Sequence, residues 1–558
     1  MIGRFHINAT LVKQVGVFDW PFFNDCAGVN QIHSKSNART TSVKDFGAAG
    51  DGGVDDSGAV QAAVDAVADG GVIWFPAGIY RIDREIRVRN RFGISFLATG
   101  ARVSGGPGRI RSFFHCDGSR DLTFDGFTFD QRGSYLPRYR ASEHGNTYHC
   151  PIQFINGEGL TVKNAEFNDL YCLSLFFFQS SRLVVEKCVF RCGVSLNDQW
   201  LQFIHLQTYG GANAIAGCRF NGAVATTPEY NPAAVFASGG GLGSSLTIED
   251  NHAEYCGRNN HGSHRLGVFD IYGDAQNVVV RNNVSLHTMA QFMRLSSTRN
   301  AQISGNRVVM SANAELDYSI FTVESVITFA PGQVGCQNIE ISANRFEDLS
   351  GRAAFAVGIL SYDWGAPATA IKVKGNIFVG CRRAVAVYGP FLDVQIVHNG
   401  GQSGRNSIEV GHNGTDGAQV TATRASEARG RFDGLLIALN VLRNDSPNDS
   451  NAITINLSKT PRYSGTVGSF IIRENSLRRI GKADAGQAIA VIVNASRPQG
   501  DVLISSNETE GYTHHWYVRG TKDVVIDGNR ALNALGAPYL DDGTNGSVTR
   551  RNNRVLRK

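Results

Sequence analysis

A short phrase recurs through most of the chain: an alternating apolar strand, a turn centred on asparagine, and a second apolar pair. Examples are NVVVRNNVS, AQISGNRVV and VVIDGNRAL. The central residues are Asn251, Asn283, Asn306, Asn344, Asn376, Asn399, Asn440, Asn475, Asn507, Asn529 and Asn553. Ala165, Cys188 and Cys218 stand at the corresponding point upstream. The shortest intervals are 22 to 24 residues, and the longer intervals indicate loops inserted into the same unit.

A unit of this length, built only from short strands, predicts one coil of a parallel β-helix with three strands and three turns. Asparagine suits such a turn because it tolerates a left-handed backbone and its amide can bond the asparagine of the next coil. A leucine-rich repeat has a similar period, but its leucine skeleton is absent, and a propeller blade needs a longer, steadier period. The sequence therefore predicts an all-β solenoid whose asparagines form one line.

Composition agrees with a turn-rich β protein and excludes several functions. The 558 residues include 63 glycines and 14 prolines. The net charge of +5 arises from 54 basic and 49 acidic residues without a Lys/Arg run, so no nucleic-acid partner is expected. Ten cysteines without CxxC or zinc spacing predict buried free thiols. No apolar run reaches membrane-spanning length, and the N-terminus lacks the pattern of a signal peptide, so no membrane partner is expected.

A glycine-rich loop near the N-terminus precedes a short amphipathic helix, DDSGAVQAAVDAV. Its N-cap candidates are Asp55, Asp56 and Ser57, and its apolar face comprises Val60, Ala63, Val64 and Val67. A solenoid exposes an apolar end that must be covered, so we expect this helix to cap the first coil. The loop is expected to be structural, because a phosphate-binding loop would need a Gly-Lys-Ser/Thr ending that is missing.

The stretch VKDFGAAGDGGVDD, followed by AVQAAVDAV and IWFPAGIYRI, resembles the N-terminal signature of the pectate-lyase-like, right-handed parallel β-helix superfamily. That signature is common in phage tailspikes, capsule depolymerases and bacterial polysaccharide-active enzymes. The resemblance covers about residues 42–100. It implies a right-handed parallel β-helix with an N-terminal capping helix and inserted loops over residues 42–558, with residues 1–41 as an anchor or cap extension. It indicates fold more than function, because the superfamily includes hydrolases, lyases, epimerases and non-catalytic binders.

In such proteins the strand two elements after the asparagine turn usually lines the saccharide groove. Here these strands read QFIHLQTY, AAVFASGG, LGVFDIYGD, AQFMRLSS, VITFAPG, AVGILSYD and AVAVYGP. Alternation directs Ile204, Leu206, Phe269, Ile271, Met293 and Leu295 inward, and His205, Gln207, Asp270, Tyr272 and Arg294 outward. Stacking of the coils predicts one outward column comprising His205, Ala237, Asp270 and Arg294.

An aspartate beside an arginine is a candidate catalytic or sugar-binding group, and the alternative is an exposed ion pair of little energetic value. An inverting glycosidase needs two carboxyl groups, for which the candidates are Asp270, Asp274, Glu324 and Asp363. Candidate substrate-binding residues are His205, Gln207, Tyr272, Arg294, Trp200, Tyr230, His264 and Trp364. Glu324, Asp363 and Trp364 are expected in or beside inserted loops, and Trp200 and Tyr230 suit stacking on sugar rings.

A lyase would instead need a base such as His205, Tyr272 or an arginine, with a cation or calcium to neutralise the uronate carboxylate. The resemblance does not extend to the NTD…DD…GHG…RIK series of polygalacturonases, the DPHE motif of alginate epimerases or the three-aspartate calcium site of pectate lyases. We therefore expect a hydrolase of a bacterial surface polysaccharide that needs no cofactor. A lyase acting on a uronate polymer, with calcium possible, and a non-catalytic polysaccharide-binding spike are the alternatives.

Two biological settings agree with these features. A phage tailspike is assembled without a signal peptide, retains free thiols and is usually a homotrimer attached to the virion through its N-terminus. A secreted bacterial enzyme is the second setting, so the expected location is a virion tail or the extracellular space. The chain ends five residues after Asn553, so we expect any trimer to be held by the β-helix flanks and inserted loops.

Overall fold

The structure is a computed structural model, and residues 40–558 form one compact unit. The described residues are 40–106, 112–130, 150–169, 173–192, 202–223, 231–257, 267–314, 319–325, 335–348, 350–351, 353, 355–361, 367–404, 407–411, 431–444, 451–457, 466–480, 486–493, 499–541 and 543–556.

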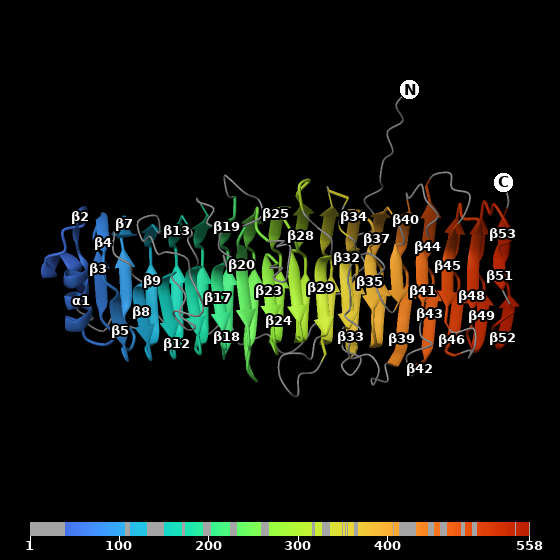
Figure 1. Cartoon of the computed structure of the whole chain (residues 1–558), viewed down its shortest axis with the longest axis horizontal. Helices are drawn as coiled ribbons and strands as arrows, with labels where there is room; N and C mark the ends of the chain where they lie inside the picture. Colours follow the sequence, from blue (N-terminus) through green and yellow to red (C-terminus); the bar gives the residue numbers. More distant parts are fainter. Residues whose placement is uncertain are drawn as a thin grey trace, which may run out of the picture. The chain divides into compact units, whose positions relative to one another are not determined.

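Three long parallel sheets run side by side along the compact unit, and we call them sheets A, B and C. Each full coil contributes one strand to sheet C, then one to sheet A and, after the asparagine turn, one to sheet B. The coils stack along the long axis of Figure 1, from the blue N-terminal end to the red C-terminal end. The predicted right-handed parallel β-helix is thereby confirmed.

Sheet A has 19 strands. They are β1 (Thr40–Ser42), β3 (Val72–Phe75), β6 (Ser95–Ala98), β9 (Arg120–Asp125), β12 (Glu158–Lys163), β15 (Ser181–Glu186), β18 (Ala212–Ala216), β21 (Ser245–Glu249), β24 (Gln276–Arg281), β27 (Arg299–Ser304), β30 (Gln337–Ser342), β33 (Ala368–Lys374), β36 (Phe391–Val397), β39 (Arg431–Ala438), β42 (Thr466–Val467), β43 (Ser469–Arg473), β46 (Asp501–Ser505), β49 (Asp523–Asp527) and β52 (Ser547–Arg551).

Sheet B follows the asparagine turns. Its strands are β2 (Asp51–Asp55), β4 (Gly78–Ile82), β7 (Ala101–Gly105), β10 (Thr128–Asp130), β13 (Glu166–Asn168), β16 (Val189–Arg191), β19 (Arg219–Asn221), β22 (His252–Glu254), β25 (Val284–Thr288), β28 (Arg307–Met310), β31 (Arg345–Asp348), β34 (Ile377–Cys381), β37 (Gly400–Ser403), β40 (Val441–Asn444), β44 (Ser476–Arg479), β47 (Glu508–Glu510), β50 (Arg530–Leu532) and β53 (Arg554–Leu556).

Sheet C has 16 strands and carries the predicted groove residues. They are β5 (Ile86–Arg89), β8 (Ser112–Asp117), β11 (Cys150–Ile155), β14 (Leu173–Phe178), β17 (Gln202–Gln207), β20 (Ala233–Ser238), β23 (Phe269–Tyr272), β26 (Met293–Ser296), β29 (Ser319–Ser325), β32 (Phe355–Ser361), β35 (Val385–Tyr388), β38 (Ile408–Gly411), β41 (Ile453–Asn456), β45 (Gln487–Ile492), β48 (His514–Arg519) and β51 (Tyr539–Asp541).

The predicted asparagines form one hydrogen-bonded ladder from Asn251 to Asn553. Asn306 illustrates a rung: its Oδ1 accepts from the backbone N–H and the Nδ2 of Asn283, both at 3.0 Å. Its own Nδ2 donates to Asn344 Oδ1 at 2.9 Å and to the carbonyl of Val280 at 3.0 Å. Each side chain therefore satisfies turn groups that would otherwise be buried without partners.

The N-terminal cap forms as expected. Helix α1 (Ser57–Ala66) follows the 3₁₀ helix η1 (Val43–Phe46) and lies at the blue end of the stack in Figure 1. It buries Val60, Ala63 and Val64. The Asp56 carboxylate accepts from the N–H groups of Ala49 and Gly50 rather than from its own helix. That contact closes the glycine-rich loop, so the loop has the structural role predicted for it.

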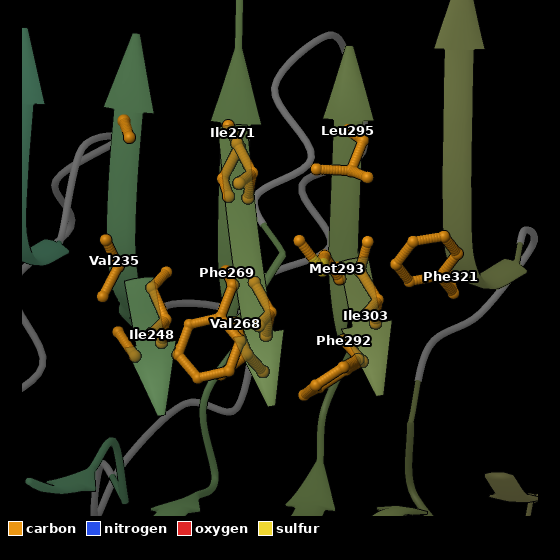
Figure 2. Packing of buried hydrophobic residues seen from close by; sticks show 14 of the residues in the cluster. Val235, Ile248, Val268, Phe269, Ile271, Phe292, Met293, Leu295, Ile303 and Phe321 are labelled. Atoms are coloured by element: carbon orange, nitrogen blue, oxygen red, sulfur yellow. The ribbon is translucent and has the colours of Figure 1, made fainter. Parts of the chain in front are cut away.

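The interior is a continuous apolar core with stacked aromatic rings. On sheet B, Phe129, Phe167, Phe190 and Phe220 stack in successive coils with ring centroids 4.8–5.0 Å apart. Behind the middle of sheet C, Figure 2 shows Phe269, Ile271, Met293 and Leu295 pointing into this core. Their inward direction, predicted from alternation, is confirmed, and it places the side chains between them on the outer face.

Eight cysteines belong to the described residues, and all eight are buried free thiols. They include Cys188 and Cys218, which precede Asn251 along the asparagine line and are fully buried there. Small apolar side chains thus continue the line where no amide is present. Within the described ranges, no helix is long and apolar enough to cross a membrane.

We predict that Asn306→Leu lowers the free energy of unfolding by about 1–3 kcal/mol, because the turn amides of the neighbouring rungs lose their acceptor. Gln302→Leu is the control, since Gln302 lies exposed on β27 of the same coil. Chemical denaturation checks both variants. Equal unfolding midpoints for Asn306→Leu and the parent would contradict the energetic role of the ladder.

Candidate functional site

The outer face of sheet C is organised in columns of side chains that run along the helix axis. The central column contains His205, Phe236, Asp270, Arg294 and Thr322, on β17, β20, β23, β26 and β29. The prediction was right for His205, Asp270 and Arg294 and wrong for Ala237. Ala237 is buried in the core opposite Leu206 and Ile271, so Phe236 fills the outward position.

Asp270 and Arg294 form a buried, two-point ion pair. Arg294 donates from Nε to Asp270 Oδ1 and from Nη2 to Oδ2, each at 3.0 Å. The side chain of Asp270 is 0% exposed and that of Arg294 is 20% exposed. The Gly267 N–H also donates to Asp270 Oδ2 at 3.3 Å. The pair is therefore not the exposed one considered from the sequence, and Asp270 itself offers no surface to a ligand.

The electrostatics of this pair follow from its burial. Burial raises the pKa of the Asp270 carboxyl, and the adjacent guanidinium of Arg294 opposes that rise. Burial also works against the charge on Arg294, but the carboxyls of Asp270 and Glu324 raise the pKa of Arg294 overall. Arg294 consequently stays charged, and Asp270 acts as its counter-charge and positioning partner.

Tyr272 and Glu324 flank the pair in the next outward column. Ser296 lies between them in the register, so they are two strands apart. The guanidinium of Arg294 lies 5.4 Å from the Tyr272 ring centroid. Both Tyr272 and Glu324 are partly exposed. Burial, together with the Glu324 and Asp270 carboxyls, raises the pKa of Tyr272 to about 12, so its phenol keeps its proton at neutral pH.

Glu324, which the sequence placed in or beside an inserted loop, is the next-to-last residue of a strand of sheet C. It lies on β29 (Ser319–Ser325), whereas the segment VITFAPG, expected to supply this groove strand, lies outside the described residues. On the same strand, Ser319 and Thr322 hydrogen-bond each other and both accept from Gln291. This buried polar network next to Arg294 was missed because no charged or aromatic residue marks it in the sequence.

The remaining sequence-predicted residues are placed differently. Asp274 lies in the turn after β23, with one carboxylate oxygen buried and without a hydrogen-bond partner. Gln207 occupies the outward column of Tyr272 on β17. Trp200, Tyr230, His264, Asp363 and Trp364 lie outside the described residues.

His205 is separated from the ion pair. It is 3% exposed and lies three strands from Arg294, between the rings of Phe176 and Phe236 at 5.3 and 4.9 Å. Burial lowers the pKa of His205 to about 3. The imidazole is therefore neutral at physiological pH, and it has almost no surface from which to abstract a proton.

A metal site is needed only by the lyase alternative. Among the residues that the structure describes, no group of three or more His, Cys, Asp or Glu side chains could hold a metal ion. The carboxyls near Arg294 are instead spaced along sheet C, on β23 and β29.

Comparison with known proteins identifies the N-terminal part most clearly. Residues 40–97 match the family described as rhamnogalacturonase A/epimerase, pectate lyase-like. This match confirms the resemblance seen in the same stretch of sequence. It covers the cap and the first coils, and it does not include the ion pair or Glu324.

Local similarity to curated proteins is confined to short segments. The plasmin and fibronectin-binding protein A of Streptococcus pneumoniae is 28% identical over 149 residues, which are 23% of this chain and 21% of that protein. The mannuronan C5-epimerase AlgE3 of Azotobacter vinelandii is 60% identical over 42 residues, 7% of this chain and 2% of that protein. The chain therefore matches about a fifth or less of the length of these relatives.

Solved structures resemble the chain over more of its length. The match to the tailspike protein of E. coli bacteriophage HK620 covers 81% of this chain and 78% of the tailspike chain, at 13% identity and a TM-score of 0.48. The match to the pneumococcal adhesin PfbA covers 90% of this chain and 91% of the PfbA chain, at 13% identity and a TM-score of 0.40. At this level the likeness concerns the fold alone.

We predict that Asp270→Asn destabilises the protein by about 3–5 kcal/mol, because it leaves a buried guanidinium without its counter-charge. Glu508→Gln, which removes one partner of the exposed pair with Arg530, should cost about 0–1 kcal/mol. Denaturant titration of both variants checks the difference. If Asp270→Asn lowers the free energy of unfolding as little as Glu508→Gln does, the buried pair is not required for stability.

The burial of His205 predicts a pH effect on stability. Because its pKa is about 3 when folded, against an ordinary 6.5, only the unfolded chain takes up the proton as pH falls between these values. Stability should therefore fall by about 1.4 kcal/mol for each pH unit below 6.5, and His205→Leu should remove this contribution. The free energy of unfolding is measured at about pH 7 and about pH 5. Its fall between these two pH values should be smaller by about 2 kcal/mol in His205→Leu than in the parent.

The control for this measurement is His398→Asn, because His398 is exposed. This variant should show the pH dependence of the parent. Identical pH dependence of the parent and His205→Leu would mean that the His205 ring is hydrated in solution.

Proposed function

We propose that the chain is a polysaccharide-degrading enzyme that hydrolyses glycosidic bonds on the outer face of sheet C, with Glu324 as an acid–base group. The observation that carries this proposal is a partly exposed carboxyl on β29, with a charged guanidinium on the adjacent strand β26 and a protonated phenol one strand further, on β23. Such a set offers a proton-transfer group together with fixed donors that orient a sugar.

The roles within the site differ from those suggested by the sequence. Glu324 is the carboxyl that a sugar can reach, whereas Asp270 is fully buried and holds Arg294 in place. Arg294 and Tyr272 supply donors to the substrate. Asp270 is therefore a positioning residue in this proposal rather than the catalytic group expected from alternation.

An inverting hydrolase requires a second carboxyl roughly 6.5–9.5 Å from the first. The partner of Glu324 in this proposal is either Asp274 or Asp363. Asp274 follows β23, which lies two strands from β29, a separation of about 9.6 Å along the axis at about 4.8 Å per strand. Mutation of each aspartate to asparagine separates these two candidates.

Charge and protonation favour hydrolysis over elimination at this site. Two carboxyls, Asp270 and Glu324, surround the single guanidinium of Arg294, and Asp270 already occupies two of its nitrogens. A uronate carboxylate would meet repulsion here rather than neutralisation. Tyr272, a candidate base for a lyase, has a pKa of about 12 and thus acts as a donor.

The setting and assembly expected from the sequence remain predictions. A tailspike-like homotrimer with virion attachment through the N-terminus, or a secreted enzyme, would both place the chain outside the cell. Three exposed apolar side chains of sheet B, Ile377 and Val379 on β34 and Val441 on β40, lie on either side of β37 and could be buried by a trimer.

We predict that Glu324→Gln reduces turnover by about 100-fold or more, because glutamine keeps the size of the side chain but cannot exchange a proton. Binding of the polysaccharide and thermal stability should persist. Glu340→Gln on β30 is the matched control, since Glu340 lies on sheet A away from the site. Reducing-end release from a panel of capsular and exopolysaccharides provides the assay.

The products separate this proposal from its alternatives. New reducing ends without ultraviolet absorbance indicate a hydrolase, whereas an unsaturated-uronate chromophore indicates a lyase. Binding without any product would support a non-catalytic role, for which the relative named after plasmin and fibronectin binding is a precedent. Full activity of Glu324→Gln on a polysaccharide that the parent cleaves would overturn the assignment of Glu324.

A further inference from the structure

Sheet B carries an apolar strip on its outer face, over the strands β34, β37 and β40, which are labelled next to one another in Figure 1. Ile377 and Val379 on β34 are 45% and 36% exposed, and Val441 on β40 is 58% exposed. Single exposed apolar side chains need no explanation, but a cluster of them marks a contact surface. We call these three residues, together with Gly400 and Gln402 of β37, the β37 strip.

The centre of the β37 strip is a gap between two apolar side chains. Gly400 pairs in register with Ile377 on one side and with Val441 on the other. Among the described residues, the nearest atom to a Cβ built at Gly400 is a backbone oxygen at 3.8 Å, so no side chain of these residues fills the gap. A second flat surface can therefore approach the backbone of β37 closely.

The charged residues on either side of the β37 strip are arranged symmetrically but with opposite signs. Glu347 on β31 and Arg478 on β44 both lie two strands from β37, and both lie in the outward column of Gln402. Arg307 on β28 and Glu508 on β47 both lie three strands from β37, in the outward column of Gly400. A negative charge on one side thus corresponds to a positive charge on the other side at both distances.

We propose that the β37 strip is the contact surface for a second copy of this chain, packed antiparallel about a two-fold axis that runs along β37. Such an axis keeps each outward column opposite itself and reverses the order of the strands. Ile377 then lies opposite Val441 of the second copy, and Gly400 lies opposite the same glycine. Glu347 lies opposite Arg478 of the second copy. One rotation thereby buries the apolar side chains and pairs the charges.

The charges select the antiparallel arrangement over the parallel one. In the antiparallel pair, Arg307 lies opposite Glu508 of the second copy. A parallel pair would place each strand opposite itself, so Glu508 and Glu510 of β47 would face the same two carboxylates. Like charges across a contact are costly, and complementary charges fix orientation more than they add affinity. The apolar centre supplies the driving force, and the charges on its two sides set the direction.

This contact is independent of the proposed function, because it uses sheet B whereas Glu324 and Arg294 lie on sheet C. It also differs from the homotrimer expected from the sequence. A cyclic trimer joins two different surfaces of neighbouring copies, whereas the β37 strip is complementary to itself. The number of copies and the residues that meet therefore distinguish the two assemblies.

The first test measures the mass of the full chain by sedimentation equilibrium at about 1–100 μM, because a strip this narrow is expected to associate in the micromolar range. We expect a monomer–dimer equilibrium. Val441→Glu should weaken the association by about tenfold or more, because the contact would bury a carboxylate against Ile377 of the second copy. Val54→Glu is the matched control, since Val54 is 55% exposed on β2, a distant strand of sheet B. Circular dichroism checks the fold of both variants.

The second test identifies the residues that meet across the axis. Gln402→Cys should give a covalent dimer with a short bismaleimide, because residue 402 lies opposite residue 402 of the second copy. Gln302→Cys, exposed on β27 of sheet A, should not, and the cysteines native to the described residues are buried. A monomer at every concentration, a trimer, equal association of Val441→Glu and the parent, or no covalent dimer from Gln402→Cys would each overturn the proposal.

Discussion

The asparagine ladder is the interaction on which the rest of the structure depends. An inner rung such as Asn306 accepts two hydrogen bonds through one carbonyl oxygen and donates two through its amide nitrogen, inside the protein. A coil displaced by one residue would lose these bonds and turn its apolar side chains outward. The ladder therefore holds successive coils in a constant register, and this register brings Asp270 of β23 opposite Arg294 of β26.

Several side chains on the outer face of sheet C are buried although they point outward. Asp270, His205 and Thr322 all point away from the coil interior, yet each is nearly or fully buried. Large side chains of neighbouring strands account for part of this burial, since Phe176 and Phe236 enclose His205. Burial changes the chemistry: it keeps His205 neutral, keeps Tyr272 protonated and makes Asp270 a partner of Arg294. Glu324 is left as the accessible carboxyl among the described residues around this pair.

The outer face of sheet C also changes in character along its length. Around Arg294 the groups are charged, whereas β14, β17 and β20 contain no charged residue. A polymer lying along the helix axis would meet both environments in sequence. Under the proposed function, specificity would depend on the order of sugars along the polymer, because each strand contributes only two or three outward side chains.

The sequence by itself determined the asparagine line, the capping helix and the inward residues of sheet C, because these follow from local periodicity and from the backbone needs of a turn. Only the tertiary structure decided that Phe236 rather than Ala237 lies in the outward column. The segment AAVFAS allows either residue to point outward, and the pairing of Ala237 with the inward-facing Ile271 selects Phe236. It also placed Glu324 within strand β29, and it showed the buried polar network of Gln291, Ser319 and Thr322. Above all, alternation gives the direction of a side chain but not what covers it. Burial depends on neighbours from coils more than twenty residues away, and for that reason the roles of Asp270 and His205 could be assigned only from the folded chain.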